Sequence, residues 1–355
     1  MSTFAKATFN ASSYSSGRPT YPDRLYGEIS RFYKRQPKGC VARWERMADI
    51  GCGTGQATSH FKGAFDEIVC VDPSAGMLSK ARDFLFKAQP SQLAHSPSET
   101  PKATQFTFAQ GYGEDLRTAI PEDGSIDVLI SAQACHWFDW SKVWPETRRV
   151  LRPKGGIAAF WVYGEMGLTA HTSLAPTIER FWQGTDKDSK SSIGAYFERP
   201  GRTVLERLLT DVPAPKDVLG NESGLEDFSR VFLVSDPKSI PVDPEPTCPV
   251  SIHAPTPMRT SWRWIDLLSY MRTASALHSY HERFPEDLQA PDDIRFLEQD
   301  LADISARLIA VKGGDVAVRF WKDLREGVAK EISGGVGLFD RVTVEWPVAM
   351  LLVRR

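Results

Sequence analysis

The stretch Met47-Ala-Asp-Ile-Gly-Cys-Gly-Thr-Gly-Gln-Ala-Thr58 decides the fold of this chain of 355 residues. A short apolar segment runs directly into three glycines at alternate positions, and a helical stretch follows. Glycines in such a turn let the backbone reverse sharply and approach a ligand with no Cβ in between. The spacing G-x-G-x-G does not complete the dinucleotide pattern G-x-G-x-x-G, and the loop lacks the Lys-Ser/Thr pair of a phosphate-binding loop. The turn therefore predicts binding of a nucleoside rather than a pyrophosphate.

An acidic residue ends the next apolar segment of the chain. Asp72 closes the run Ile68–Val71 and lies 21 positions after Gly51. The carboxyl ends of neighbouring parallel strands meet at one edge of a sheet, and a carboxylate there can accept hydrogen bonds from both hydroxyls of a ribose. Together with the glycine turn, Asp72 predicts a nucleoside site. The alternative is a tight strand–helix turn in which Asp72 only caps the helix.

Short apolar segments alternate with helix-like stretches from Arg46 to Val162, which is the pattern of a parallel sheet covered by helices on both faces. We therefore predict an α/β, doubly wound fold. The segment Lys87–Thr104 is rich in proline and small polar residues, and we expect an exposed loop there. The expected strands are Met47–Ile50, Ile68–Val71, Phe106–Gln110, Ile126–Ser131 and Ile157–Val162.

The second half of the chain has a different pattern. Seven prolines in Ser235–Met258 predict a lack of regular structure over most of that segment. Apolar residues recur at helical spacing from Trp262 to Glu331, which predicts three helices and thus an added helical cap. Thr343–Val353 predicts a last strand, with Pro347 at a bulge or an edge. Further helices are expected at Thr177–Trp182 and Thr203–Leu209, and a strand at Phe228–Val234.

Composition narrows the possible partners. The chain is 41% hydrophobic and 25% charged, and 43 Lys and Arg against 45 Asp and Glu give a net charge of -2, which provides no basic field for nucleic acid. No apolar run reaches the roughly 18 residues of a transmembrane helix, and Met1–Asn10 lacks a secretory pattern. Five scattered cysteines without a CxxC pair predict reduced thiols and no zinc site. We expect a cytoplasmic protein with a small-molecule substrate, no nucleic-acid or membrane partner, no metal and an undetermined oligomeric state.

Several motifs together resemble a known family. Asp49-Ile-Gly-Cys-Gly-Thr-Gly55, the strand end at Asp72 and Leu151-Arg-Pro-Lys-Gly-Gly156 resemble class I S-adenosylmethionine-dependent methyltransferases over roughly residues 10 to 165. More narrowly, three segments resemble the fungal trans-aconitate methyltransferase group: Tyr14–Pro22, Cys135–Asp139 and Tyr196–Arg202. The resemblance implies S-adenosyl-L-methionine as cofactor and a seven-stranded, mostly parallel sheet with an antiparallel last strand. The expected divisions are an N-terminal segment over the cofactor site (1–45), a core (46–234), a Pro-rich loop and helical cap (235–335) and a C-terminal strand (336–355).

The resemblance also implies roles for individual residues. The glycines of the turn and Asp72 hold the methionine and ribose parts, and Met77 packs on the adenine, unless it is only a core residue. Tyr112 stands where the family often has an Asp for the adenine amine, which leaves Glu114, Asp115 or a backbone carbonyl for that contact. The expected cofactor-binding residues are Tyr14, Arg18, Asp49, Gly51, Gly53, Gly55, Asp72, Met77, Tyr112, Gly113, Glu114 and Gln133.

The end of the expected fourth strand faces the reactive end of the cofactor, because ligands of open α/β sheets lie beyond the carboxyl ends of the strands. His136 is the expected catalytic residue, which takes a proton from a hydroxyl or donates a hydrogen bond to a carboxylate. Arg18 and Arg202 can each pair with a carboxylate of the cofactor or of the substrate. A Trp-rich cap indicates a substrate bulkier than a small tricarboxylate. The expected substrate-binding residues are His136, Trp137, Trp161, Tyr163, Tyr196, Arg202 and Trp262.

Three functions fit these patterns. The first is an O-methyltransferase that converts a small-molecule carboxylate to a methyl ester, a reaction that alignment alone can promote without a base. The second methylates a hydroxyl of a secondary metabolite with His136 as general base. The third is a protein that binds the cofactor without transferring its methyl group. Methylation of nucleic acid is disfavoured, because Ser131–Ala134 does not match the Asn/Asp-Pro-Pro-aromatic segment used on flipped bases.

Overall fold

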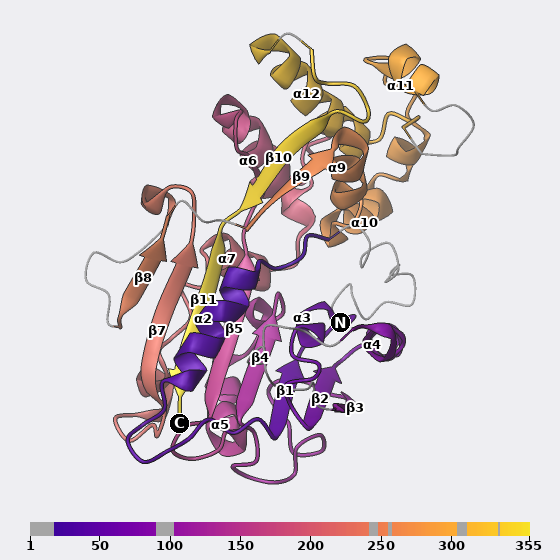
Figure 1. Ribbon diagram of the computed structural model, residues 1–355. Coiled ribbons are helices and arrows are strands. Elements are labelled where there is room, and N and C mark those ends of the chain that lie inside the picture. The colour runs from indigo at the N-terminus through magenta and orange to yellow at the C-terminus, as the bar shows by residue number, and fades with distance from the viewer. Residues whose placement is uncertain (1–17, 90–102, 241–247, 255–257, 304–310, 333) are drawn as a thin grey trace.

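A central sheet of eight strands forms the core of the structure, a computed structural model that describes residues 18–89, 103–240, 248–254, 258–303, 311–332 and 334–355. The strand order is β3-β2-β1-β4-β5-β11-β7-β8 (Figure 1). Seven strands run in the same direction, and β11, between β5 and β7, is antiparallel to both. The predicted mostly parallel sheet with a reversed last strand is therefore confirmed. The strands span Arg46–Ile50 (β1), Glu67–Asp72 (β2), Gln105–Gln110 (β3), Val128–Ala132 (β4), Ile157–Tyr163 (β5), Glu226–Leu233 (β7), Val250–His253 (β8) and Val348–Arg354 (β11).

The eighth strand differs from the prediction of seven. β8 lies within Ser235–Met258, where prolines predicted little regular structure. Its residues fall between Pro249 and Pro255, so the ladder needs no N–H that a proline lacks. It pairs parallel with β7, with Arg230 opposite Val250. A short proline-free stretch is thus enough to extend the sheet at its edge.

Pro347 divides the predicted last strand into two. β10 (Arg341–Trp346) belongs to a second sheet of three strands with β6 (Gly167–Leu168) and β9 (Met258–Arg263), whereas β11 completes the central sheet. Proline has no N–H to donate, so the ladder is interrupted where the chain passes from one sheet to the other. The yellow segment in Figure 1 follows this path.

Helices cover both faces of the central sheet. Alternate strand residues pack on α2 (Asp23–Lys34) and α4 (Ala75–Lys87) on one face and on α5 (Trp140–Val150) on the other. This alternation is the period of two of a strand buried on both faces. The other helices around the sheet are α3 (Gln56–Ser59), α7 (Gly201–Glu206) and α8 (Pro215–Leu219). The predicted helix at 203–209 therefore starts and ends earlier, and most of the predicted loop at 87–104 lies outside the described residues.

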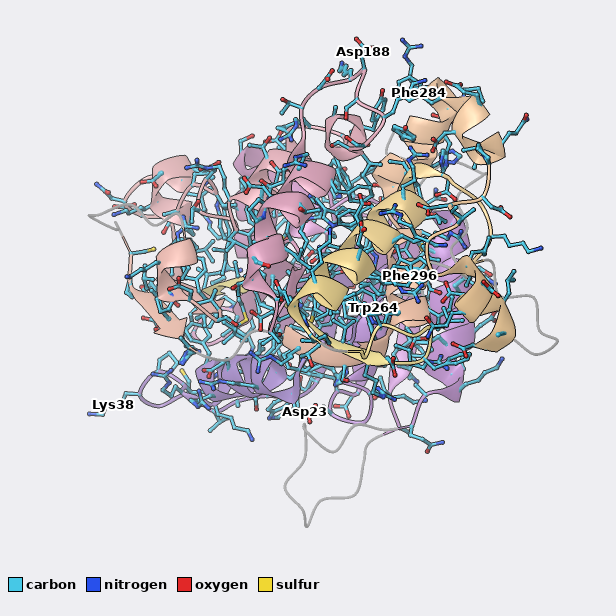
Figure 2. All side chains as sticks on the ribbon, turned by 90° about the horizontal axis from the view of Figure 1, so that it is seen from above. Asp23, Lys38, Asp188, Trp264, Phe284 and Phe296 are labelled. Carbon is cyan, nitrogen blue, oxygen red and sulfur yellow. The ribbon has the colours of Figure 1, made fainter. Side chains whose placement is uncertain are left out.

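A cap of helices and the three-stranded sheet lies beyond the carboxyl ends of the parallel strands (Figure 1). Residues 262–331 hold four helices in their described part, rather than the three predicted. The cap helices are α6 (Ala175–Gln183), α9 (Trp264–Met271), α10 (Ser275–Arg283), α11 (Leu297–Asp303) and α12 (Val316–Glu331). Figure 2 shows Trp264 near the middle of the molecule beside α12, and this side chain is fully buried. No helix in the described ranges is both long and apolar enough to cross a membrane.

Candidate functional site

The larger cavity of the structure, about 330 Å³, opens at the ends of β1, β2, β3 and β4. This volume is in the range of small-molecule and cofactor sites. Nine residues expected at the site line it: Gly51, Gly53, Asp72, Met77, Tyr112, Gly113, Glu114, Gln133 and Trp137. The sequence prediction did not include Tyr21, Cys52, Thr54, Gln56, Ala57, Pro73, Ser74, Gly111, Ala132, Ala134 and Phe138, although most of them neighbour a predicted residue in the chain.

The glycine turn brings backbone to the wall of this cavity. Gly51, Gly53 and Gly55 have φ angles of 72°, 55° and 82°, in the left-handed region. A Cβ on Gly51 would lie 2.4 Å from the Cβ of Ala134, so only glycine fits beside the loop that follows β4. Gly53 faces open space, whereas Gly55 packs against Leu85 of α4 and does not line the cavity.

Asp72 is held at the cavity by the loops on either side of it. Its Oδ2 accepts a hydrogen bond from Gly53 N at 2.9 Å, and its Oδ1 accepts one from Ser74 N at 2.8 Å. Each carboxylate oxygen can accept a further bond. Burial raises the pKa of Asp72, and the two backbone bonds oppose that shift. Ser74 also caps α4 by accepting from Met77 N, which fixes the first turn that carries Met77.

Asp49 lies beneath the turn and does not reach the cavity, in contrast to its expected role as a direct cofactor ligand. Its side chain is fully buried, and its Oδ2 accepts from Thr58 Oγ1 at 2.6 Å. Burial raises its pKa to about 7. Asp49 therefore supports the turn from below through Thr58.

The lining of the larger cavity has an acidic character. Among the described residues it includes Asp72 and Glu114 but no Lys, Arg or His. A pyrophosphate would find no counter-charge there, whereas ribose hydroxyls and a positively charged sulfur suit a carboxylate-bearing wall. S-adenosylmethionine, a nucleoside with a sulfonium group, therefore fits this cavity.

Gln133 stands between this cavity and a second one. Its φ of 55° is uncommon for a residue other than glycine. Its side-chain amide accepts from Tyr163 N at 2.7 Å and donates to Tyr163 O at 3.1 Å, so it extends the pairing of β4 and β5 beyond their ends. The amide thus mainly holds the wall between the two cavities in place. One N–H and one lone pair of the amide remain for a ligand.

The second cavity is small, about 60 Å³, and it shares Gln133 and Trp137 with the first. Residues of β5, α7 and the cap surround it. Five expected residues line it in addition to Gln133: Arg18, His136, Trp137, Tyr163 and Arg202. The sequence prediction did not assign Gly164, Glu165, Trp182, Phe197, Leu205, Tyr270, Thr273, Ala274 and Ser275 to the site. Glu165 follows the end of β5, so the strand-end rule could have found it.

Two guanidinium groups, those of Arg18 and Arg202, line the second cavity, and two acids pair with Arg202. Arg18 Nη1 donates to the hydroxyl of Tyr163 at 2.7 Å, and its guanidinium lies 5.5 Å from the ring centre of Tyr270. Arg202 donates from Nε to Glu206 at 3.0 Å and from Nη2 to Glu165. Its guanidinium is also stacked 3.9 Å from the ring centre of Phe197.

His136 is buried between these arginines. Burial and the charges of Arg202 and Arg18 lower its pKa to about 3, so the ring is neutral near pH 7. Its Nδ1 is buried and has no hydrogen-bond partner among the described residues. A ring with so low a pKa is a weak general base, which disfavours the expected role of His136 in removing a proton. A neutral ring remains able to donate or accept a hydrogen bond.

The remaining predicted substrate residues lie away from both cavities. Trp161 is fully buried and packs edge-on against Tyr21 and Tyr26. Tyr196 packs against Tyr280 and Phe284, and Trp262 packs against Tyr270 and Trp346. The aromatic residues of the cap mostly pack on one another, so the cavity is too small for the bulky substrate that the sequence suggested. Tyr14 lies outside the described residues.

Comparisons with known proteins agree with this geometry. Residues 48–159 match the family model described as "Methyltransferase domain". This part of the chain is similar to methyltransferase domains. A solved structure named a "putative type II methyltransferase" from Anaeromyxobacter dehalogenans covers 95% of the chain and 97% of its own with a TM-score of 0.55 at 21% identity, which shows the shared fold. The structural similarity extends beyond this region to nearly the whole chain.

The relatives by sequence match about half of this chain. The "Probable S-adenosylmethionine-dependent methyltransferase CRG1" of Saccharomyces cerevisiae is 34% identical over 160 residues, 45% of this chain and 47% of its own. The malonyl-[acyl-carrier protein] O-methyltransferase of Hahella chejuensis is 28% identical over 50% of this chain and 54% of its own. The chain spans about half the length of the curated relatives it matches, and the narrower trans-aconitate resemblance stays a prediction.

Proposed function

We propose that the chain is an S-adenosylmethionine-dependent O-methyltransferase whose acceptor is a carboxylate of a small molecule, so that the product is a methyl ester. The observation that carries the proposal is the position of Arg18 and Arg202 at the second cavity, where both lower the pKa of His136. A positive potential in a buried cavity favours an anionic ligand. The relative from Hahella chejuensis, whose name specifies methylation on oxygen, is consistent with this class of reaction.

In this proposal the larger cavity binds the cofactor and the smaller one binds the acceptor. In the larger cavity, Asp72 and the glycine turn would hold the adenosine part of the cofactor, and Met77 would pack on its base. When bound, the cofactor supplies a methyl group on a positively charged sulfur that leaves as a neutral thioether, and the carboxylate loses its charge on forming the ester. Trp137, which lines both cavities, stands where the two ligands meet.

The acceptor side needs orientation rather than a base. A carboxylate is already ionised at neutral pH, so no proton has to be removed before it attacks. Arg18, fixed by the Tyr163 hydroxyl, can hold one carboxylate oxygen and direct the other toward the shared wall. The neutral His136 ring can donate a further hydrogen bond, and the surrounding aromatic side chains exclude water.

A transfer assay with labelled cofactor tests the proposal. We expect aliphatic acids to give base-labile methyl esters and the corresponding alcohols and phenols to give no product. Arg18→Gln is expected to raise KM for the acid about 10- to 100-fold, because a charge-assisted hydrogen bond to the carboxylate is lost. Arg199→Gln is the matched control, since Arg199 pairs with Glu206 and does not line the cavity.

Two results would contradict the carboxylate assignment. Methylation of hydroxyl groups alone, with activity abolished in His136→Gln, would support the alternative in which His136 acts as base. An unchanged KM in Arg18→Gln would remove Arg18 from acceptor binding.

A further inference from the structure

Glu165 is a half-buried acid at the second cavity that the carboxylate proposal does not use. It follows β5 by two residues, and its Oε1 accepts from Arg202 Nη2. Its other oxygen, Oε2, is buried and has no hydrogen-bond partner among the described residues. A buried carboxylate oxygen without a donor is costly, and a ligand that donates a hydrogen bond would remove that cost. Glu165 is therefore placed to accept a hydrogen bond from something that enters the cavity.

Residues that line the same cavity hold further buried polar atoms without a hydrogen-bond partner among the described residues. Among them are Nδ1 of His136 and Nε1 of Trp182. The indole N–H only donates, an ionised carboxylate only accepts, and a neutral imidazole nitrogen does either. A ligand that satisfies all three atoms must present both an acceptor and a donor. The carboxylate of the acceptor molecule is the acceptor, so a second group must be the donor.

The charges around Glu165 restrict that second group. Burial raises the pKa of Glu165, and the charge and hydrogen bond of Arg202 oppose that shift. A second carboxylate placed against the ionised form of Glu165 would be repelled. An ammonium group would meet the positive potential of Arg18 and Arg202 that already lowers the pKa of His136. A neutral hydroxyl meets neither obstacle, and it is small enough for a cavity of about 60 Å³.

We propose, on the basis of the proposed function, that the acceptor is a hydroxy acid and that Glu165 Oε2 selects it by accepting a hydrogen bond from its hydroxyl group. Glu165 is thus a specificity-determining residue. Arg202 positions it, and Glu206 on the other side of the guanidinium holds Arg202 in place.

The test compares acids that differ only in the hydroxyl. Butyrate, 2-hydroxybutyrate and 3-hydroxybutyrate are offered to the full chain with labelled S-adenosylmethionine, and kcat/KM for ester formation is measured. We expect at least one hydroxybutyrate to exceed butyrate by tenfold or more, because a site built to bind a hydroxyl discriminates against the analogue that lacks it. In Glu165→Gln this ratio should fall close to one, since the amide can keep its oxygen on Arg202 and present N–H groups to the cavity instead.

Glu179→Gln is the matched control. Glu179 is an exposed acid of α6 that does not line the cavity. Its substitution is expected to leave the hydroxyl preference unchanged. Binding of S-adenosylhomocysteine by calorimetry checks that each variant is folded. If Glu165→Gln does not fold, Glu165→Asp, which keeps the charge and withdraws it from the cavity, is expected to lose the same preference.

The outcomes separate the two proposals. Ester formation from all three acids at equal kcat/KM, or an unchanged preference in Glu165→Gln, would overturn the role of Glu165 and leave carboxylate methylation standing. If no ester forms from any of the acids and phenols or alcohols are methylated instead, carboxylate methylation fails, and the hydroxy-acid assignment fails with it.

Discussion

The two adjoining cavities are built in different ways. The larger one takes nearly all its lining from short stretches at the ends of four strands: 51–57, 72–77, 111–114 and 132–138, with Tyr21 in addition. The smaller one draws on distant parts of the chain: Arg18, 133–137, 163–165, Trp182, 197–205 and 270–275. The first is encoded locally, strand end by strand end, whereas the second exists only once the cap has packed on the sheet.

The titratable residues at the two cavities also differ. Burial raises the pKa values of Asp49 and Asp72 at and beneath the larger cavity, whereas burial and two arginines lower the pKa of His136 at the smaller one. We propose that the larger cavity, lined by Asp72 and Glu114, takes the positively charged ligand and that the smaller one, with Arg18 and Arg202 beside Glu165, takes the negatively charged one. Gln133 and Trp137 lie where the two cavities adjoin, which is where a sulfonium and a carboxylate would meet.

The largest expected effect is the loss of the Asp72 carboxylate. In Asp72→Asn we expect affinity for S-adenosylhomocysteine to fall by a factor of 100 or more, about 3 kcal/mol, because charged hydrogen bonds to two ribose hydroxyls are lost. Calorimetry measures the change. Asp115→Asn, an exposed acid next to the cavity that does not line it, is the control. Equal affinities in the two variants would remove Asp72 from the cofactor site.

A pair of glycine substitutions sharpens the account of the turn. Gly51→Ala is expected to destabilise the protein by about 2–3 kcal/mol, because its Cβ would meet Ala134 and its φ is positive. In Gly53→Ala the new Cβ meets no other atom, so only the positive φ causes strain. The free energy of unfolding should fall by about 1 kcal/mol. Denaturant unfolding of both variants measures the difference. Equal costs would show that the loop after β4 does not approach Gly51 as closely as the structure shows.

A smaller effect is expected in the pH dependence of protein stability, through His136 at the smaller cavity. The pKa of folded His136, about 3, lies below the ordinary value of 6.5, so the unfolded chain takes up the proton first as the pH falls. The stability from this residue is complete above pH 6.5 and is lost progressively toward pH 3. Between pH 7 and pH 5 the wild type should lose about 2 kcal/mol more than His136→Gln. If the free energy of unfolding depends on pH in the same way in both proteins, the pKa of folded His136 is not lowered.

The sequence predicted what local patterns determine. Five strands of the sheet and the glycine turn with Asp72 lie where short apolar runs and strand ends placed them. The sequence predicted a bulge or an edge at Pro347 but not that the strand divides there. A proline indicates an interrupted ladder, and only the structure shows that β10 pairs in a second sheet. Trp161, Tyr196 and Trp262 were assigned to the substrate because aromatic residues were abundant, but the cap uses them for packing. Glu165 was missed because its hydrogen bond with Arg202, 37 positions away in the sequence, cannot be predicted from local patterns.

The central claim is that the acidic cavity takes the adenosyl sulfonium and the basic cavity takes the anionic acceptor. A crystal structure of the full chain with S-adenosylhomocysteine and 2-hydroxybutyrate tests both parts at once. We predict the ribose against Asp72, the acid between Arg18 and Glu165, and the sulfur beside the shared wall at Trp137. Nucleoside density outside the larger cavity, or the acid bound away from Arg18, would contradict the account.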